Sequence, residues 1–149
     1  MAATGKAYPM LAKSLGDKIL DVDSDTLKAA LFSAYTYAAT HQFFSDVLAA
    51  GTQASGTGYT SGGVALSSVT WTRSGDVYTL DAADIAWNAT GGSLAGKYVV
   101  IYDSTPASDA TRPLIGYVNL DGAGGTLTAT DANFSIAWNA SGILTVTAS

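Results

Sequence analysis

The residues best suited to chemistry are acidic, since the chain has twelve aspartates, no glutamate, one histidine and no cysteine. Asp21, Asp23 and Asp25 have the D-x-D-x-D spacing that opens a calcium-binding loop, in which alternate carboxylates reach one hard cation. The rest of that motif differs, because Thr26 stands where the loop needs glycine and Phe32 where it needs a bidentate acid. We therefore predict no metal site and expect these carboxylates to accept hydrogen bonds from turn amides.

The motifs of catalysis and phosphate binding are also incomplete. Ser61 stands where G-x-G-x-x-G needs its third glycine, and Val64 stands where a P-loop needs lysine. His41 is the sole imidazole, so a serine triad would have to recruit it from beside two phenylalanines. Two aspartates could still meet in space to hydrolyse a glycoside, although no glutamate is available as the acid. We expect no enzymatic activity, no cofactor and no small-molecule substrate.

Charge is distributed unevenly along a chain whose net charge is −5. Residues 1–20 carry Lys6, Lys13 and Lys18 against one aspartate, whereas residues 21–149 carry four basic residues against eleven aspartates. This acidic balance argues against a nucleic-acid partner, because phosphate binding needs a basic stripe. No run approaches 18 apolar residues and no apolar stretch follows the first lysine, so we predict neither a membrane span nor a secretory signal.

The elements that position these residues are predicted to be mostly strands. Short β-branched or aromatic runs alternate with turns every 8–12 residues, which indicates a mainly β fold, an antiparallel β-sandwich or barrel of about eight strands. The runs cover residues 64–71, 77–80, 85–87, 98–102, 114–118, 126–130, 134–138 and 143–147. One short helix is expected over residues 41–50, where Phe44, Val47 and Leu48 recur at helical spacing before Gly51.

The rest of the chain divides by composition. Residues 1–20 are predicted to form an extended N-terminal arm with a weak helical patch, and residues 21–149 a single β-rich domain. Residues 26–35 alternate with period two, which suggests a strand, although their alanine content leaves a helix possible. Residues 51–63 hold five glycines and no charge, so we expect a loop with positive φ at several points.

A short internal repeat indicates where large aromatic side chains pack. Ile85–Gly91 recurs as Ile136–Gly142, each with a tryptophan followed by an Asn-Ala-(Thr/Ser)-Gly turn. The simpler interpretation places Trp87 and Trp138 in the core, with asparagine and glycine supplying the turn. The alternative is a paired aromatic ligand site. Tyr59, in the glycine-rich segment, is a further candidate for core or subunit contacts.

Several segments spread over nearly the whole chain form a wider pattern. They are Thr4–Tyr8, Asp23–Lys28, His41 with Ser45–Val47, Gly56–Leu66, Leu80–Asp84 with Trp87, Tyr98–Tyr102, Pro113–Val118, and Trp138 with Gly142. This pattern resembles a family of small virion structural proteins of tailed bacteriophages, of the head decoration or accessory type. Its most specific part is the glycine-rich segment, and residues 34–40 depart from it in being less polar and acidic.

The resemblance implies a capsid decoration (cement) protein that binds the outer shell of the head and stabilises it. Its expected partners are the major capsid protein and further copies of itself, as a homotrimer, and its expected location is the virion after synthesis in the host cytoplasm. Together with the charge distribution, this points to Lys6, Tyr8, Lys13 and Lys18 as capsid-contact residues. The alternative is a tail or fibre module whose aromatic residues bind a host surface carbohydrate.

Overall fold

The computed structural model describes residues 2–148 and has 43% strand and 11% helix. Its elements are β1 (Ala2–Ala3), β2 (Lys6–Ala7), α1 (Leu11–Gly16), β3 (Leu27–Tyr35), α2 (Phe44–Ala50), β4 (Gly51–Gln53), β5 (Val64–Ala65), β6 (Thr70–Ser74), β7 (Val77–Asp81), β8 (Ile85–Asn88), β9 (Ser93–Gly96), β10 (Tyr98–Asp103), a 3-10 turn (Asp109–Thr111), β11 (Leu114–Asn119), β12 (Leu127–Thr130), β13 (Asn133–Trp138) and β14 (Leu144–Thr147). The predicted mainly β class is confirmed. All eight predicted runs contain a strand, and residues 26–35 form a strand rather than a helix.

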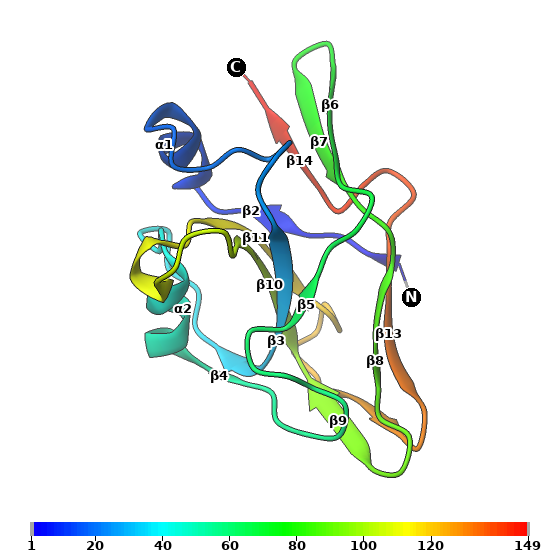
Figure 1. Ribbon diagram of the computed structural model, residues 1–149. Coiled ribbons are helices and arrows are strands. Elements are labelled where there is room, and N and C mark those ends of the chain that lie inside the picture. The colour runs from blue at the N-terminus through cyan, green and yellow to red at the C-terminus, as the bar shows by residue number, and fades with distance from the viewer. Residues whose placement is uncertain (1, 149) are drawn as a thin grey trace.

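The strands form one large sheet and three small ones. The large sheet has the order β2-β11-β10-β3-β4, with β5 also paired to β3, and all its pairs are antiparallel. The small sheets are β1-β13-β8, β14-β7-β6 and β12-β9. In Figure 1 α2 lies on one side of the large sheet and the β8–β13 and β6–β7 pairs lie on the other, while α1 lies near β14, and its Leu11 packs in the core shared with the small sheets. The arrangement is sandwich-like and does not close into a barrel.

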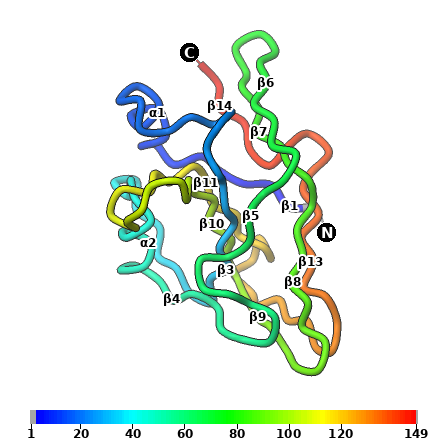
Figure 2. The backbone as a smooth tube through the Cα atoms, viewed as in Figure 1, coloured from blue at the N-terminus to red at the C-terminus, as the bar shows by residue number. Residues whose placement is uncertain are grey.

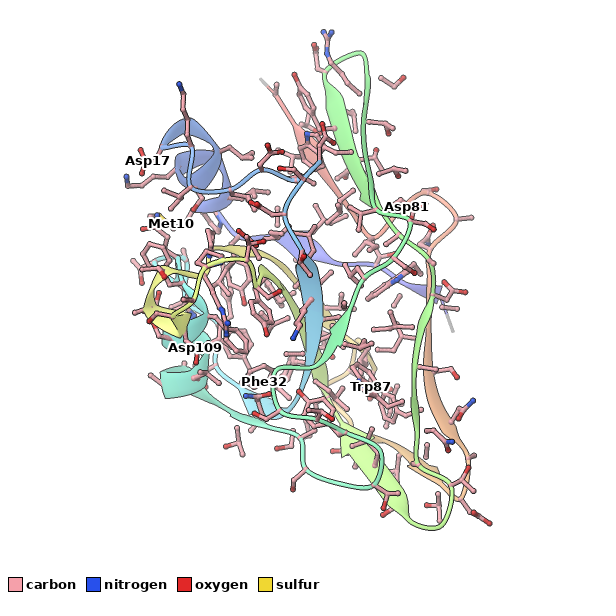
Figure 3. The ribbon with its side chains drawn as sticks, viewed as in Figure 1. Met10, Asp17, Phe32, Asp81, Trp87 and Asp109 are labelled. Carbon is pink, nitrogen blue, oxygen red and sulfur yellow. The ribbon has the colours of Figure 1, made fainter. Side chains whose placement is uncertain are left out.

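The large sheet separates two hydrophobic cores. On β10, Val99 and Ile101 belong to the core shared with the small sheets, whereas Val100 and Tyr102 belong to the core under α2. A strand covered on both faces needs a continuous apolar run rather than an alternating one, which explains the sequence of β10. Figure 3 shows Phe32 on the α2 side of the sheet and Trp87 on the side of β8.

The N-terminal segment packs against the body of the protein. β1 pairs in parallel with β13, and β2 pairs with β11, so the blue end of the trace in Figure 2 runs along the strands of the domain. Ala3, Leu11 and Leu20 are buried in the larger core. The sequence prediction divided residues 1–20 from residues 21–149, but the structure joins them, because these apolar side chains are part of one core.

Two local boundaries differ from prediction. α2 begins at Phe44 rather than His41, because the Asp46 carboxylate accepts hydrogen bonds from the backbone N–H groups of Gln42 and Phe43, both at 2.9 Å. The glycine-rich loop starts only after Gln53, since β4 continues directly from α2 and pairs with β3.

The positive φ angles expected in this loop are present. They occur at Gly58, Gly62 and Gly63, where φ is +80°, +93° and +82°. At Gly63 the backbone also passes so close to the carbonyl of Ala29 that no side chain fits. Glycine is therefore required there both by conformation and by space.

Candidate functional site

Three exposed lysines stand on the N-terminal segment. Lys6 lies on β2, Lys13 on α1 and Lys18 just beyond α1, and all three are exposed. Lys13 forms an ion pair with Asp17 one helical turn away. Within residues 2–148 neither Lys6 nor Lys18 forms an ion pair. Because the segment is held in the fold, the backbone positions from which these lysines project are fixed on the surface.

Five of the eight tyrosines gather on the α2 side of the large sheet; this tyrosine cluster consists of Tyr8, Tyr35, Tyr37, Tyr98 and Tyr117. The rings of Tyr37 and Tyr117 stack with centroids 4.8 Å apart, and Tyr8 and Tyr117 are 5.4 Å apart. Tyr35 and Tyr98 meet edge to face at 6.0 Å. Stacked and edge-to-face contacts are the arrangements that the ring quadrupole favours.

Strand register explains why these rings meet. Tyr117 on β11 lies opposite Val100 on β10, whose neighbour two residues away is Tyr98. On its other side Tyr117 lies opposite Lys6 of β2, and directly opposed residues of an antiparallel pair project to the same face. Tyr8, two residues after Lys6, therefore continues along this face.

A chain of hydrogen bonds fixes the buried end of the tyrosine cluster. The Tyr8 hydroxyl donates to the Tyr35 hydroxyl at 2.8 Å, and the Tyr35 hydroxyl lies 2.8 Å from Nδ1 of His41. Burial raises the pKa of Tyr8 far above its ordinary value, and burial also raises the pKa of Tyr35 to about 12. Both hydroxyls are therefore neutral at physiological pH and hold the rings in place rather than exchanging protons.

This arrangement corrects the prediction that Tyr8 contacts the capsid. Only 1% of its surface is exposed, because its ring is enclosed by the cluster and its hydroxyl is engaged with Tyr35. It supports the surface from beneath and does not present a ring to another molecule. The exposed lysines remain candidates for contact.

The outer end of the cluster is accessible. Tyr37 is 39% exposed, and Tyr98, Tyr117 and His41 are partly buried around it, with Lys6 at the rim. Exposed aromatic rings beside a cation suit contact with a protein or a carbohydrate. Tyr37 lies in residues 34–40, the segment that departs from the family pattern, and it is among the tyrosines that the sequence offers for a protein or carbohydrate interface.

An open groove lies beside the lysines, between β2, α1 and β14. Its volume is about 510 Å³, and its lining is mainly apolar; the residues include Lys6, Pro9, Leu11, Leu15 and Val146. The N-terminal segment thus supplies both charged and apolar surface on one side of the molecule.

The other predicted aromatic residues support the fold. Trp87 and Trp138 are 5% and 7% exposed, and the Trp138 indole N–H donates to the carbonyl of Ala83 at 3.0 Å. Tyr59 packs on Trp87, and its hydroxyl both accepts from the backbone N–H of Leu31 and donates to Oε1 of Gln53 at the end of β4. The core interpretation of both tryptophans is confirmed, and Tyr59 fastens a loop to that core.

The two turns of the internal repeat, residues 88–91 and 139–142, have the same hydrogen-bond pattern. The side-chain oxygen of Asn88 accepts from the N–H of Thr90, and that of Asn139 accepts from the N–H of Ser141, both at 2.9 Å. Each turn then ends at a glycine with positive φ. The repeated sequence therefore encodes a turn, as the simpler interpretation proposed.

The Asp21–Asp25 segment is a turn closed by its own carboxylates. Asp21 Oδ1 accepts from the backbone N–H of Asp23 at 3.1 Å, and Asp25 Oδ2 accepts from that of Asp21 at 2.7 Å. The hydrogen bonds that the Asp21 carboxylate accepts, first from the Ser24 side chain and then from the Asp23 N–H, hold its pKa below the ordinary value. The expected role in satisfying turn amides is confirmed.

Comparison of the chain with protein-family models, curated proteins and solved structures finds no match. The relation to bacteriophage virion proteins thus stays a prediction from the sequence pattern. In the part of the chain from residue 2 to residue 148, neither helix has the length and apolar character needed to cross a bilayer.

Proposed function

We propose that this protein is a non-enzymatic structural component of a tailed-bacteriophage virion, a decoration protein that binds the outer shell of the head. The observation that carries the proposal is the N-terminal segment, which presents Lys6, Lys13 and Lys18 at the surface while its apolar residues are locked into the core. Because the backbone that carries them is part of the fold, the three lysines present their charges in a defined arrangement, which suits recognition of an acidic surface in one orientation.

The remaining surface supports contacts between copies. The exposed positions of β6 and β12 include Thr70, Thr72, Thr128 and Thr130. Short, uncharged side chains lose little hydration energy when two surfaces meet. In addition, β6 and β12 each have one unpaired edge within the described residues. We propose that such edges contribute to a homotrimer, which native mass spectrometry of the purified protein would detect as a threefold mass.

The test compares occupancy on capsids. Lys6, Lys13 and Lys18 are all changed to glutamine, and binding to purified heads of the source phage is measured by sedimentation and by imaging of intact particles. We expect occupancy to fall at least about tenfold and wild-type occupancy to decrease with salt, because the interaction is electrostatic.

A charge-matched variant provides the control. Lys28, Arg73 and Lys97 lie outside the N-terminal segment, and their joint change to glutamine alters net charge equally. This variant should retain occupancy. An equal loss of occupancy in both variants would mean that net charge alone explains the binding. Unchanged occupancy in the N-terminal variant would refute the role of its lysines.

The second candidate is a tail or fibre module that binds a host surface carbohydrate. The stacked, accessible Tyr37–Tyr117 pair favours it, because sugar faces pack on exposed aromatic rings. On a glycan array, Tyr37→Ala should abolish binding, while Tyr78→Ala, from the stacked Trp71–Tyr78 pair, should preserve it. Glycan binding combined with density on the tail would replace the decoration proposal.

A further inference from the structure

Asp103 is a buried carboxyl group with an unsatisfied oxygen. It is the last residue of β10, pairs with Leu27 of β3 and is 1% exposed. Its Oδ1 accepts from the backbone N–H of Thr105 at 2.8 Å, but its Oδ2 has no hydrogen-bond partner among residues 2–148. A buried charge without a partner is costly, so this oxygen calls for an explanation.

The carboxyl of Asp103 lines an open cavity that contains further oxygen ligands. The cavity has a volume of about 370 Å³, and its lining includes Lys18, Asp21, Ser24, Asp25, Asp103 and Thr105. Asp25 lines the same cavity, and the pKa of Asp103 is raised, mainly by burial and also by the neighbouring Asp25 carboxyl. Two ionised carboxylates side by side repel each other, and a cation bound between them would offset that repulsion.

Within residues 2–148 no basic side chain forms an ion pair with Asp25 or Asp103. Lys18 lines the cavity, yet the ion pairs within residues 2–148 are Lys13–Asp17 and Asp109–Arg112. The oxygen donors are carboxylates and hydroxyls, which hard divalent cations prefer. We propose that the cavity binds one Ca²⁺ or Mg²⁺ ion through the carboxylates of Asp25 and Asp103, with the remaining coordination positions completed by hydroxyl groups and water.

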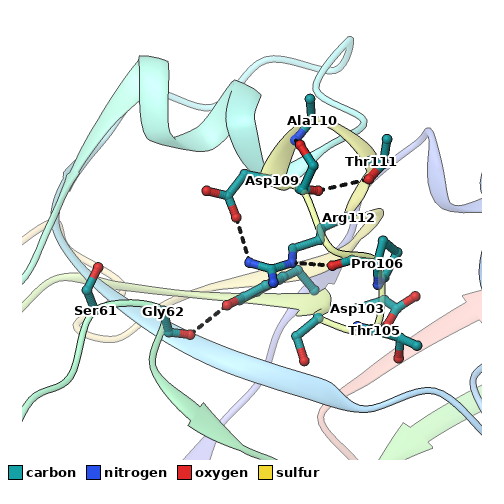
Figure 4. Close-up of polar contacts among 12 residues, drawn as sticks. Ser61, Gly62, Asp103, Thr105, Pro106, Asp109, Ala110, Thr111 and Arg112 are labelled. Carbon is teal, nitrogen blue, oxygen red and sulfur yellow. Dashed lines mark hydrogen bonds and ion pairs between the residues drawn. The ribbon is translucent and has the colours of Figure 1, made fainter.

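The walls of this site are already held together. Thr26 donates its backbone N–H to the Thr105 hydroxyl at 2.8 Å, and Ser104 donates both its N–H and its hydroxyl to the Thr26 carbonyl. Arg112 donates to the carbonyl of Pro106 at 2.8 Å and holds the next turn, as Figure 4 shows beside Asp103. The cation would join the Asp21–Asp25 turn to the loop after β10, with the Asp103 side chain turning to present Oδ2.

The ligand set predicts modest affinity. Within residues 2–148 no three acidic or imidazole side chains are placed to hold a metal together. A site with two carboxylates and water resembles Mg²⁺ sites and the weaker Ca²⁺ sites, for which dissociation constants are about 10⁻⁴ to 10⁻³ M. This differs from the calcium-loop motif considered from sequence, because Asp103 lies far from the Asp21–Asp25 turn along the chain.

The experiment measures thermal unfolding and binding heat at neutral pH. Full-length protein is freed of metal with a chelator, and CaCl₂ or MgCl₂ is added at constant ionic strength to several millimolar. We expect the wild-type Tm to rise by several degrees with at least one cation, since a ligand that binds only the folded state stabilises it. Isothermal titration should give one site per chain.

Three variants distinguish the proposal from its rivals. Asp103→Asn should abolish the cation response without lowering the Tm in chelator, Asp25→Asn should weaken it at least tenfold, and the exposed Asp76→Asn should leave it unchanged. If Asp103→Asn does not fold, Asp25→Asn against Asp76→Asn decides. The proposal is overturned if the wild-type Tm does not rise with either cation, or if Asp25→Asn responds like wild type. It is also overturned if Lys18→Met lowers the Tm in chelator, because Lys18 would then be the positive charge that stabilises the Asp25–Asp103 pair.

Discussion

At the scale of single residues, buried tyrosine hydroxyl groups make the stability of the fold depend on pH. Burial raises the pKa values of Tyr35, Tyr59 and Tyr102 to about 12, from an ordinary value of 10.0. Each of these hydroxyls also makes a hydrogen bond inside the protein. Folding therefore favours their neutral forms, whereas the unfolded chain ionises them near pH 10.

We predict that the contribution of these tyrosines to stability is constant below pH 10 and falls progressively between pH 10 and about pH 12. The sign follows from linkage: a raised pKa in the folded state means that the unfolded state releases protons first as the pH rises. Urea unfolding at successive pH values, with tyrosinate absorbance recorded in parallel, measures this. Tyr59→Phe should make the alkaline decline shallower, whereas Tyr78→Phe should not; identical slopes in both variants would contradict the assignment.

At the scale of elements, one glycine determines how the glycine-rich loop returns to β3. Gly63 has φ +82°, and a Cβ there would overlap the Ala29 carbonyl and the neighbouring backbone of β3. The backbone of a central strand cannot move without disturbing β10, with which β3 is paired. The loop therefore tolerates no side chain at this point.

We predict that Gly63→Ala destabilises the protein by at least about 4 kcal/mol or prevents folding, because conformational strain and steric overlap act together. Gly75→Ala is the matched control, since Gly75 also has positive φ (+59°) but open space around it. Its cost should be about 1–2 kcal/mol, from the backbone conformation alone. Equilibrium denaturation of both variants measures the difference, and equal costs would argue against the overlap.

At the scale of the whole molecule, the N-terminal segment is part of the hydrophobic core. Leu11 on α1 is 2% exposed, whereas Ile19, a few residues later, is 38% exposed. Removal of residues 1–20 would take Ala3, Tyr8 and Leu20 out of the core as well as Leu11. A deletion therefore tests folding rather than capsid contact, and the lysine substitutions above are the appropriate test of contact.

We predict that Leu11→Ala costs about 2–4 kcal/mol of unfolding free energy, while Ile19→Ala costs less than about 1 kcal/mol. The reason is that the first substitution opens a cavity between α1 and the sheets, and the second trims a side chain near solvent. Chemical denaturation with a single cooperative transition in both variants measures the difference. If Leu11→Ala costs no more than Ile19→Ala, the N-terminal segment is independent of the core after all.

Local patterns in the sequence predicted much of the fold. Alternating apolar residues such as Phe134 and Ile136 located β13, because one side of such a strand faces the core. A period-two pattern also located β3, although both faces of that strand are buried. The α2 prediction was correct in type and three residues early in its start, since the capping by Asp46 depends on backbone geometry. Two-residue strands such as β1 and β2 carry too short a pattern to be seen.

The sequence by itself determined the mainly β class, the two Asn-Ala-(Thr/Ser)-Gly turns and the unequal charge of the two parts of the chain, because each depends on neighbouring residues alone. Only the tertiary structure decided that Tyr8 is buried, that five tyrosines meet, and that Asp25 lies beside Asp103. These are contacts between distant segments, set by strand register and by packing across the large sheet. No local pattern specifies them, because register depends on which strands find each other when the two cores form.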